Sequence, residues 1–304
     1  MRIVSLLPSV TRVLYALGAG DDIVGVTYAC PQPEGQFKPV VSHDMFATSG
    51  YTSEQIAAFL RMLGHQAQGL FTIDEAKLEE CAPDVVFLQG SCELCVPGTN
   101  SNEGTLAGIS GNPRAIMIQP HSLGEVMADI RRIGEVANRK PEAETFLSTL
   151  KQRMMKVMRL AAGAARGKRR RVLLLEWVDP PTACGLWLPE LVDAAGGIPL
   201  LGSPQRPAVP TPWEQVLSAN PEVIIISPAG FGLEGAANET ELLRKREGWS
   251  SISAVVSGDV YAVDGTRFFF QPDDRVIDSL ELIASILYPE VFGEVHRPDA
   301  LRLG

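Results

Sequence analysis

Several features that the 304-residue sequence lacks narrow its function. The sequence contains no G-x-x-x-x-G-K-[ST], so the phosphate-cradling loop that this motif forms is not predicted. G-x-S-x-G is absent, and the four histidines show no H-E-x-x-H-like spacing. Excess positive charge is missing as well, because the net charge is −9 and the pI is near 5.1. A hydrolase, a zinc peptidase and a protein that wraps nucleic acid are therefore disfavoured.

Long hydrophobic runs are also missing. No segment reaches about 18 uninterrupted apolar residues, so no membrane-spanning helix is predicted. Met1-Arg2 passes directly into Ile3–Leu7, without the charged region, long apolar core and small-residue cleavage site of a secretory signal. The five cysteines, an odd number in a long chain, do not suggest a disulfide framework. From these absences we expect a cytoplasmic protein; a periplasmic or membrane-associated one is the alternative if the true start lies upstream.

Short apolar runs bounded by turn residues alternate with amphipathic helical patterns along the chain. Strands are predicted at residues 3–7, 23–26, 84–88, 115–118, 171–176, 223–227 and 260–263, and helices at 10–17, 52–63, 188–195, 211–218 and 274–287. This rhythm is typical of mainly parallel sheets covered by helices. The sequence therefore predicts an α/β fold.

A long helical stretch divides the chain into two halves. The pattern is helical from about residue 122 to 165 with a break near Lys140-Pro141, and residues 142–160 predict a helix of roughly 28 Å. We therefore predict an N-terminal lobe (1–121), linking helices (122–166) and a C-terminal lobe (167–304), each lobe Rossmann-like. The basic run Arg166–Arg171 is expected to be solvated surface. In such a fold a ligand is expected in the cleft between the lobes, outside the carboxyl ends of the strands.

Large flat side chains gather just after the predicted strands. Aromatic rings bury about 150–250 Å² each and suit a large, rigid ligand. The alternative is that two or three of these rings belong to the core, since buried aromatics are common. The predicted ligand-binding residues at these strand ends are Tyr28, Trp177, Trp187, Asp264, Phe268, Phe269, Phe270 and Gln271.

A C-x-x-C pair, Cys92 and Cys95, follows the strand at 84–88 and enters a loop. The pair is either a redox or metal site or one edge of a pocket. Val96-Pro97-Gly98 follows it, which argues against a helix that would lower a thiol pKa. Tetrahedral zinc would need further ligands, for which Cys30, Cys81 or Cys184 are available. We favour the pocket edge and keep a thiol-dependent redox or metal-binding protein as the alternative.

Three stretches resemble the cobalamin and iron-siderophore group of ABC-transporter substrate-binding proteins, the class III group with a rigid helix between two lobes. They are RIVSLLPSVTRVLYALGAGDDIVGVTYAC, APDVVFLQ and PTPWEQVLSANPEVIIIS. A leaderless cobalamin-binding branch of this group is similar to SCELC, WVDPPTACGLWLPELVDAAGG and VYAVDGTRFFFQPDDRVIDSLELIASILYPE. The resemblance implies a non-enzymatic protein that binds cobalamin or a related corrinoid between its lobes.

The sequence departs from that branch at positions that affect the ligand. The branch usually has a His where this chain has Leu186, and an Asn-Arg-Pro-Gly-Pro-Arg-like run where it has Phe270–Arg275. Imidazole is a natural ligand of cobalt and iron. Because this chain has Leu186 in place of that His, the resemblance does not imply direct coordination of the metal here. A ferric siderophore or haem is the alternative ligand, although Arg267 and Arg275 are few basic groups for an anionic chelate.

The resemblance also bears on a membrane partner. Exported members of the group dock on an ABC permease through one surface acid on each lobe. Glu214 matches the second-lobe acid, whereas Ala76, with Glu75 beside it, stands at the first-lobe position. The resemblance therefore supports docking on a permease through the second lobe but not through the first.

Overall fold

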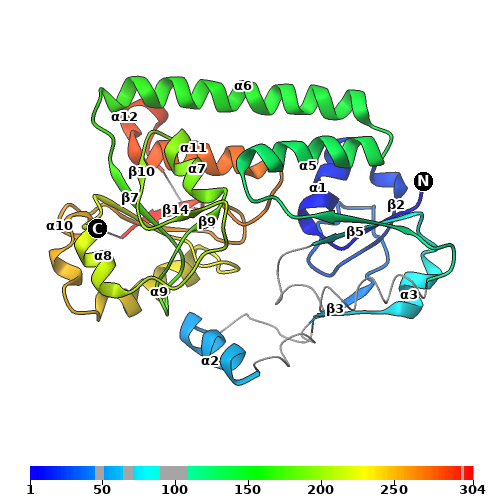
Figure 1. Ribbon diagram of the computed structural model, residues 1–304, viewed down its shortest axis with the longest axis horizontal. Helices are drawn as coiled ribbons and strands as arrows, with labels where there is room; N and C mark the ends of the chain where they lie inside the picture. Colours follow the sequence, from blue (N-terminus) through cyan, green and yellow to red (C-terminus); the bar gives the residue numbers. More distant parts are fainter. Residues whose placement is uncertain (45–50, 64–70, 90–108, 296–297, 304) are drawn as a thin grey trace. The chain divides into compact units, whose positions relative to one another are not determined.

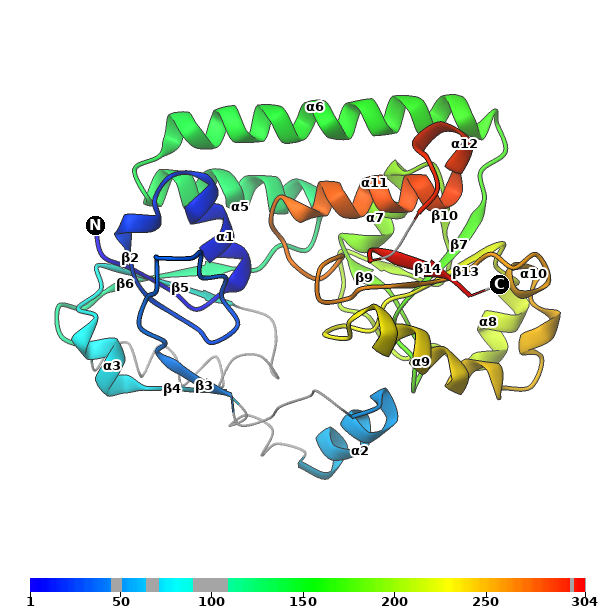
Figure 2. The same ribbon diagram turned by 180° about the vertical axis from the view of Figure 1, so that it is seen from behind.

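The computed structural model describes residues 1–44, 51–63, 71–89, 109–295 and 298–303, which form two compact α/β units (Figures 1 and 2). Unit 1 comprises Met1–Ser49, Leu60–Pro120 and Val126–Ser148, and unit 2 comprises Gly50–Phe59, His121–Glu125 and Thr149–Gly304. The predicted α/β class with mainly parallel sheets is confirmed. The division into residues 1–121, 122–166 and 167–304 stays a prediction.

Unit 1 is built on a four-stranded parallel sheet of order β2-β1-β5-β6. Its strands are Ile3–Ser5 (β1), Ile23–Val26 (β2), Val85–Gln89 (β5) and Arg114–Ile118 (β6), and a separate antiparallel pair joins Ser42–Asp44 (β3) to Phe71–Ile73 (β4). Helices Pro8–Ala16 (α1) and Leu123–Val136 (α5) lie on one side of the sheet and Glu75–Glu80 (α3) on the other (Figure 1). Val4, Val86 and Leu78 form the core beneath α3.

Unit 2 is built on a larger sheet of order β10-β7-β12-β13-β14, in which β14 and the side strand β8 run antiparallel and the others run parallel. Its strands are Arg171–Trp177 (β7), Thr182–Ala183 (β8), Ile198–Pro199 (β10), Val223–Ile226 (β12), Val260–Val263 (β13) and Ala300–Arg302 (β14), and Gly185–Leu186 (β9) pairs with Ser203–Pro204 (β11). Val and Ile dominate β12 and β13 because both faces of these strands are covered.

Helices cover both faces of the unit 2 sheet. Leu188–Ala194 (α7) and Arg275–Leu287 (α11) lie on one face, and Trp213–Ala219 (α8) and Leu233–Arg244 (α9) on the other (Figures 1 and 2). Two short helices, Ser253–Val256 (α10) and Pro289–Phe292 (α12), complete the unit. Leu173, Leu175, Ile224 and Ile226 point toward α8 and α9, so the alternate residues of β7 and β12 face α7 and α11.

The longest helix, Lys140–Ala165 (α6), has 26 residues and a length of roughly 39 Å. It confirms the predicted break near Lys140-Pro141 and extends past the predicted end at residue 160. The part from Thr149 onward belongs to unit 2, where Arg153 forks between Asp278 and Glu281 of α11 at 2.7 Å from each. Among the residues that the structure describes, no helix is long and apolar enough to cross a bilayer.

Helix Ser53–Leu63 (α2) agrees within one residue with the helix predicted at 52–63. The Thr52 Oγ1 accepts the backbone N–H of Gln55 at 3.2 Å, and the Gln55 side chain accepts the N–H of Thr52 at 2.9 Å. This reciprocal pair is a capping box. A carboxylate of α9, Glu239, accepts the N–H of Ser53 at 3.0 Å, so the first turn of α2 packs in unit 2.

Candidate functional site

Three adjacent parallel strands of unit 2, β7, β12 and β13, end at the same edge of the sheet. In the strand register Leu175 pairs with Ile226, and Ile226 pairs with Ala262. The next residues, Glu176 and Ser227, therefore lie side by side and point to the face opposite to α8 and α9. Asp264 follows β13 directly. Polar groups converge at an edge that is otherwise lined by apolar strands, which is the usual place for a ligand in an open α/β sheet.

Ser227 stands out because its hydroxyl is fully buried and has no hydrogen-bond partner among the described residues. A buried hydroxyl without a partner is costly and uncommon in a native fold. Gly265, on the neighbouring strand end, approaches it closely: a Cβ there would lie 2.2 Å from the Pro228 carbonyl oxygen and 3.2 Å from the Ser227 Oγ. Only glycine fits this position, so the two strand ends pack backbone to backbone around the unpaired hydroxyl.

Glu176 carries the most perturbed carboxyl of this edge. Burial raises its pKa from 4.5 to about 7. The Gly185 N–H, which donates to the carboxylate at 3.0 Å, lowers the pKa but does not offset the burial. The carboxyl is therefore partly protonated near neutral pH and can either donate or accept a hydrogen bond. Cys184 lies beside it. Burial is the larger cause that raises the pKa of the Cys184 thiol, and the negative charge of Glu176 raises it further.

Trp177 presents an aromatic face at the same edge. Its ring is half-buried and meets Phe231 edge to face, with centroids 5.7 Å apart and an angle of 81° between the planes. The indole Nε1–H donates to the Asp179 carbonyl at 3.0 Å, and Arg246 holds the Asp179 carboxylate at 2.6 Å. The ring is thus fixed from two sides while part of it stays accessible.

The segment after β13 contains the three consecutive phenylalanines. Phe268 and Phe269 are buried, and so is Trp187, whose Nε1–H donates to the Phe269 carbonyl at 3.1 Å. These three side chains are buried in unit 2. Their interpretation as ligand-facing walls stays a prediction.

Phe270 and Gln271 remain half-buried and accessible from this segment. Phe269 holds a left-handed φ of +74°, which a bulky residue rarely adopts. Its N–H donates to the Ser279 Oγ at 3.0 Å, and the Ser279 hydroxyl donates to the Arg275 carbonyl at 3.0 Å. Contacts from α7 and α11 thus fix a strained backbone immediately before Phe270.

The ionic groups around this edge already form hydrogen bonds or ion pairs within the protein. Asp264 Oδ1 accepts the N–H of Thr266 at 2.9 Å and its hydroxyl at 2.6 Å. Arg267 pairs with Asp299, and Arg275 pairs with the fully buried Asp273 at 2.6 Å. Both arginines that the sequence offers for an anionic ligand therefore already have carboxylate partners.

Unit 1 contributes fewer of the predicted residues. Tyr28 follows β2 and is 44% exposed, and its backbone N–H lies 3.3 Å from the Ser42 Oγ. Cys92 and Cys95 lie outside the described residues. Cys30, Cys81 and Cys184 are buried free thiols, and burial raises the pKa of each. In the part of the chain that the structure describes, no three His, Cys, Asp or Glu side chains gather as a metal site would require.

Glu214, the predicted docking acid, lies exposed in the first turn of α8. Glu75 and Ala76 are likewise exposed, at the start of α3. These positions leave the two docking assignments as predictions.

Glu176, Ser227 and Phe231 are candidate site residues that the sequence reasoning left out. The signal for the first two is a polar residue that ends a run of buried apolar ones, LLLE and VIIIS. No local sequence pattern marks Phe231, because its contact with Trp177 forms only when the chain folds.

Comparison with known proteins identifies relatives across nearly the whole chain. The model of the family described as "Periplasmic binding protein" matches residues 3–266. An uncharacterized ABC transporter substrate-binding lipoprotein of Bacillus subtilis (strain 168), YvrC, is 24% identical over 301 residues, covering 96% of this chain and 82% of the relative.

Solved structures share the fold. A periplasmic heme-binding protein from Pseudomonas aeruginosa superposes with a TM-score of 0.69 at 18% identity, covering 100% of this chain and 99% of the other. The periplasmic vitamin B12-binding protein BtuF of Vibrio cholerae gives a TM-score of 0.63 at 19% identity, covering 94% and 96%. The class III periplasmic-binding-protein-like architecture expected from the sequence is thereby confirmed.

The cytoplasmic address expected from the N-terminus is wrong. The matching family is one of periplasmic binding proteins, and the curated relative is a lipoprotein. The start of the sequence was a poor guide because a leader or anchor is separate from the fold and leaves no trace in it. The expected absence of enzymatic activity agrees with a family of solute-binding proteins.

Proposed function

Because the chain belongs to the periplasmic binding protein family, we propose that it is the substrate-binding component of an ABC importer and that its ligand is cobalamin or a related corrinoid. The carboxyl edge of the unit 2 sheet supplies the contacts that unit 2 makes with this ligand. Trp177 and Phe270 offer apolar surface to the corrin, and Gln271, Glu176 and Asp264 offer polar groups to its rim.

The observation that carries this proposal is the engagement of Arg267 and Arg275 by Asp299 and Asp273. Haem and ferric siderophores carry carboxylates or other anionic groups, which need unpaired cations. The rim of cobalamin carries neutral amides, which pair with carboxylates such as those of Glu176 and Asp264. The strand ends of unit 2 thus match an amide-rimmed ligand better than an anionic one.

Haem is the second candidate, because a periplasmic heme-binding protein shares the fold as the vitamin B12-binding protein does. Tyr28, a residue that is 44% exposed, would then supply an axial oxygen. A thiol-dependent or metal function through Cys92 and Cys95 is a third possibility, outside the described residues.

Titration calorimetry with cyanocobalamin, hemin and a ferric siderophore decides between these ligands. We expect cyanocobalamin to bind and the two anionic ligands to bind at least about tenfold more weakly. Trp177→Ala should weaken cobalamin binding by about tenfold or more, since a partly exposed aromatic anchor is lost. Trp213→Ala, which removes an equally half-buried indole from the α8 face, is the matched control. Binding of hemin alone, or equal losses in both variants, would contradict the proposal.

We propose Glu214 as the contact to a permease. Its exposed carboxylate at the start of α8 can meet a basic residue of a membrane partner. Glu214→Lys should abolish ligand-stimulated ATPase activity of the reconstituted transporter and leave ligand affinity unchanged. An unchanged ATPase response would remove Glu214 from the interface.

A further inference from the structure

The second half of α6 bears a run of positive charge that the binding function does not use. From residue 145 to 175 the sequence contains no Asp or Glu, yet it holds nine of the 27 Lys and Arg residues. In a chain with a net charge of −9, this is a marked local reversal of sign. Such a segregation of charge points to an anionic partner.

Internal ion pairs account for only part of this charge. Arg153 pairs with Asp278 and Glu281, Arg169 with Asp193, Arg170 with Asp259 and Arg171 with Glu222. Within the described part of the chain the remaining five basic side chains form no ion pair; they are Lys151, Lys156, Arg159, Arg166 and Lys168. All five are exposed.

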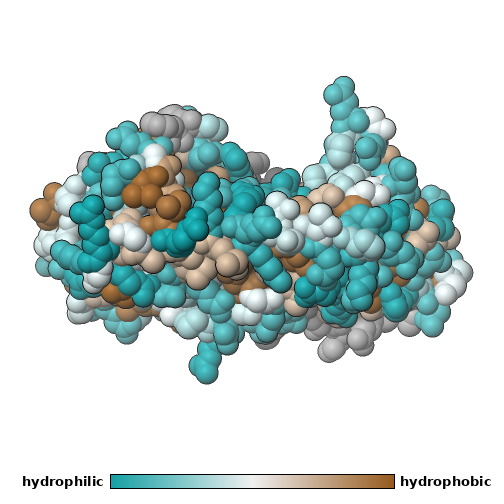
Figure 3. All heavy atoms as spheres, turned by 90° about the horizontal axis from the view of Figure 1, so that it is seen from above, coloured by the Kyte–Doolittle hydropathy of each residue, from teal (hydrophilic) through white to brown (hydrophobic). Residues whose placement is uncertain are grey.

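Exposed apolar side chains lie among these cations. Met155 and Met158 are 66% and 43% exposed. At 100° per residue, Lys151, Met155, Met158, Arg159 and Ala162 fall within about 100° of arc on α6, so they share one solvent-facing stripe. Figure 3, which looks down onto α6, shows brown apolar atoms set among teal hydrophilic ones at the left of the view.

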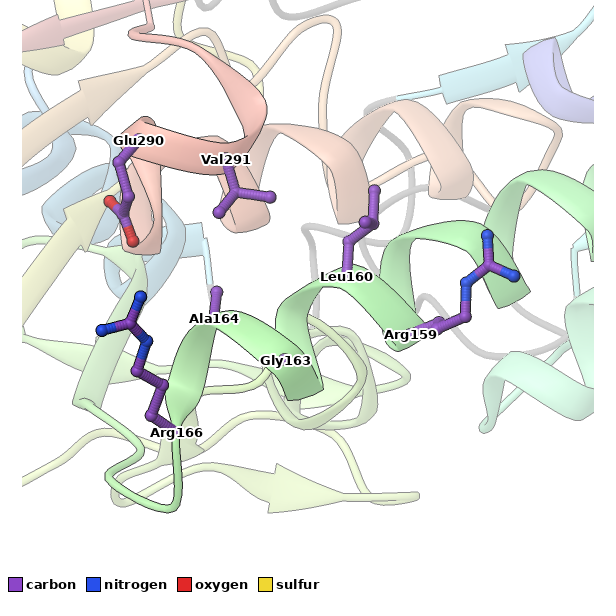
Figure 4. Close-up of a pocket in the computed structure, with 7 residues that line it drawn as sticks. All are labelled: Arg159, Leu160, Gly163, Ala164, Arg166, Glu290 and Val291. Atoms are coloured by element: carbon purple, nitrogen blue, oxygen red, sulfur yellow. The ribbon is translucent and has the colours of Figure 1, made fainter.

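A groove beside the stripe continues the same character. Between the end of α6 and α12 lies a cavity of about 490 Å³, and Figure 4 shows Leu160, Ala164 and Val291 between Arg159 and Arg166. Gly163 widens it, since a Cβ there would meet no atom within 4 Å. Val291 is 43% exposed, and Glu290 is the single acidic residue of the lining. The groove thus adds an apolar floor and one further cation, Arg166, to the stripe.

We propose that this surface, Lys151 to Lys168 together with α12, binds the surface of an anionic phospholipid bilayer. Lipid phosphates would pair with the five unpaired cations, and the methionines and Val291 would enter the interface between headgroups and acyl chains. Exposed apolar tips favour a bilayer over a nucleic acid, whose phosphate backbone offers them no apolar phase. Long, flexible Lys and Met side chains also suit a fluid surface better than a folded acidic protein.

Vesicle co-sedimentation of the full chain tests this proposal. Vesicles of phosphatidylcholine and phosphatidylglycerol at equal amounts should pull the protein down at low salt, and phosphatidylcholine alone should not. Raising the salt should release it, because the Debye length shrinks from about 10 Å at 0.1 M to 3 Å at 1 M. Equal binding to both kinds of vesicle, or none to either, would overturn the proposal.

Matched charge reversals locate the surface. Lys151→Glu/Arg159→Glu should weaken vesicle binding by at least about 25-fold, at about fivefold for each cation near the membrane. Lys245→Glu/Arg206→Glu changes the net charge identically at exposed positions elsewhere in unit 2, and should leave most of the binding intact. Equal losses in the two variants would show a general charge effect and refute the assignment.

Two further variants separate a bilayer from other partners. Met155→Ser/Met158→Ser should weaken binding while leaving every charge in place, and Glu290→Gln should strengthen it severalfold. Circular dichroism and a thermal melt verify that each variant is folded. Self-association through this face, seen by sedimentation velocity and lost in Lys151→Glu/Arg159→Glu without any vesicle binding, would mean that a second copy of the chain is the partner, and the proposal would fail.

Discussion

At the scale of single residues, Glu176 makes stability depend on pH. Its folded pKa of about 7 lies above its ordinary value of 4.5, so the folded state holds a proton that the unfolded state releases between these values. The stability that this group contributes is fully present below about pH 4.5 and is lost as the pH rises through 7. A shift of this size corresponds to up to about 3 kcal/mol.

Glu176→Gln should therefore stabilise the protein at pH 8 by up to about 3 kcal/mol and have little effect at pH 4.5. The amide oxygen still accepts the Gly185 N–H, so the packing is kept. Urea denaturation of both proteins at a series of pH values measures the difference. The same difference at every pH would show that the carboxyl is not the cause.

Ser227 gives the second residue-scale prediction. Replacing its unpaired buried hydroxyl with hydrogen, in Ser227→Ala, should raise the free energy of unfolding by about 1 kcal/mol. If the hydroxyl meets a polar group of the ligand, the same change should lower ligand affinity by about fivefold or more. A denaturation curve and a calorimetric titration of one variant test both effects. A gain in stability without a loss of affinity would remove Ser227 from the ligand site.

At the scale of elements, the segment between β13 and α11 is held by its neighbours rather than by its own sequence. Ser279 of α11 accepts the Phe269 N–H, and Trp187 before α7 donates to the Phe269 carbonyl. Because both backbone groups of Phe269 are satisfied from outside, its left-handed conformation persists. Strain at this point orients Phe270 and Gln271.

Ser279→Ala should destabilise the protein by about 1–3 kcal/mol, since it leaves a buried N–H without a partner. Ser285→Ala is the matched control: Ser285 lies on the same helix and donates to the carbonyl four residues earlier, Glu281, but it accepts no backbone N–H from the described residues. The control should change stability by less than about 0.5 kcal/mol. Thermal melts compare the two variants. An equal loss of stability in both would show that Ser279 does not hold the loop.

Elements with strong periodic signals were predicted well, and the exceptions have physical causes. The strand 260–263 has the predicted bounds, whereas β1 ends at Ser5 because Pro8 is already the first residue of α1. Helix α9 was not predicted, since Gly235 and Asn238 interrupt its helical pattern. Strand β14 has three residues, too few for a periodic signal, and forms by pairing with β13.

The site was harder to predict than the fold. Polar residues at strand ends follow from the sequence pattern, but the burial of Phe269 depends on Trp187 and Ser279, 82 and 10 residues away. Whether an aromatic ring lines a pocket or fills a core is decided by such distant contacts. Ligand identity depends likewise on whether Arg267 and Arg275 are already paired, which spacing alone does not show.

At the scale of the whole molecule, unit 2 includes the larger, C-terminal part of a helix that the sequence assigns to a linker. Val157 and Ala161 of α6 are buried, and Arg153 forks to α11. A fragment of residues 149–304 should therefore unfold cooperatively in urea, whereas residues 167–304 should be several kcal/mol less stable or unfolded, because an apolar face of about two to three helical turns is lost. Equal midpoints for the two fragments would show that α6 is peripheral to unit 2.

The continuity of α6 also restricts how this chain can vary in length. Leu147 is buried in the half that belongs to unit 1, and Val157 and Ala161 are buried in the half that belongs to unit 2. Inserting or deleting one residue between them would turn one half by about 100° relative to the other and bring buried side chains into water. Substitutions along the exposed stripe leave both faces in register. Natural variants of this protein should therefore hardly differ in the length of α6.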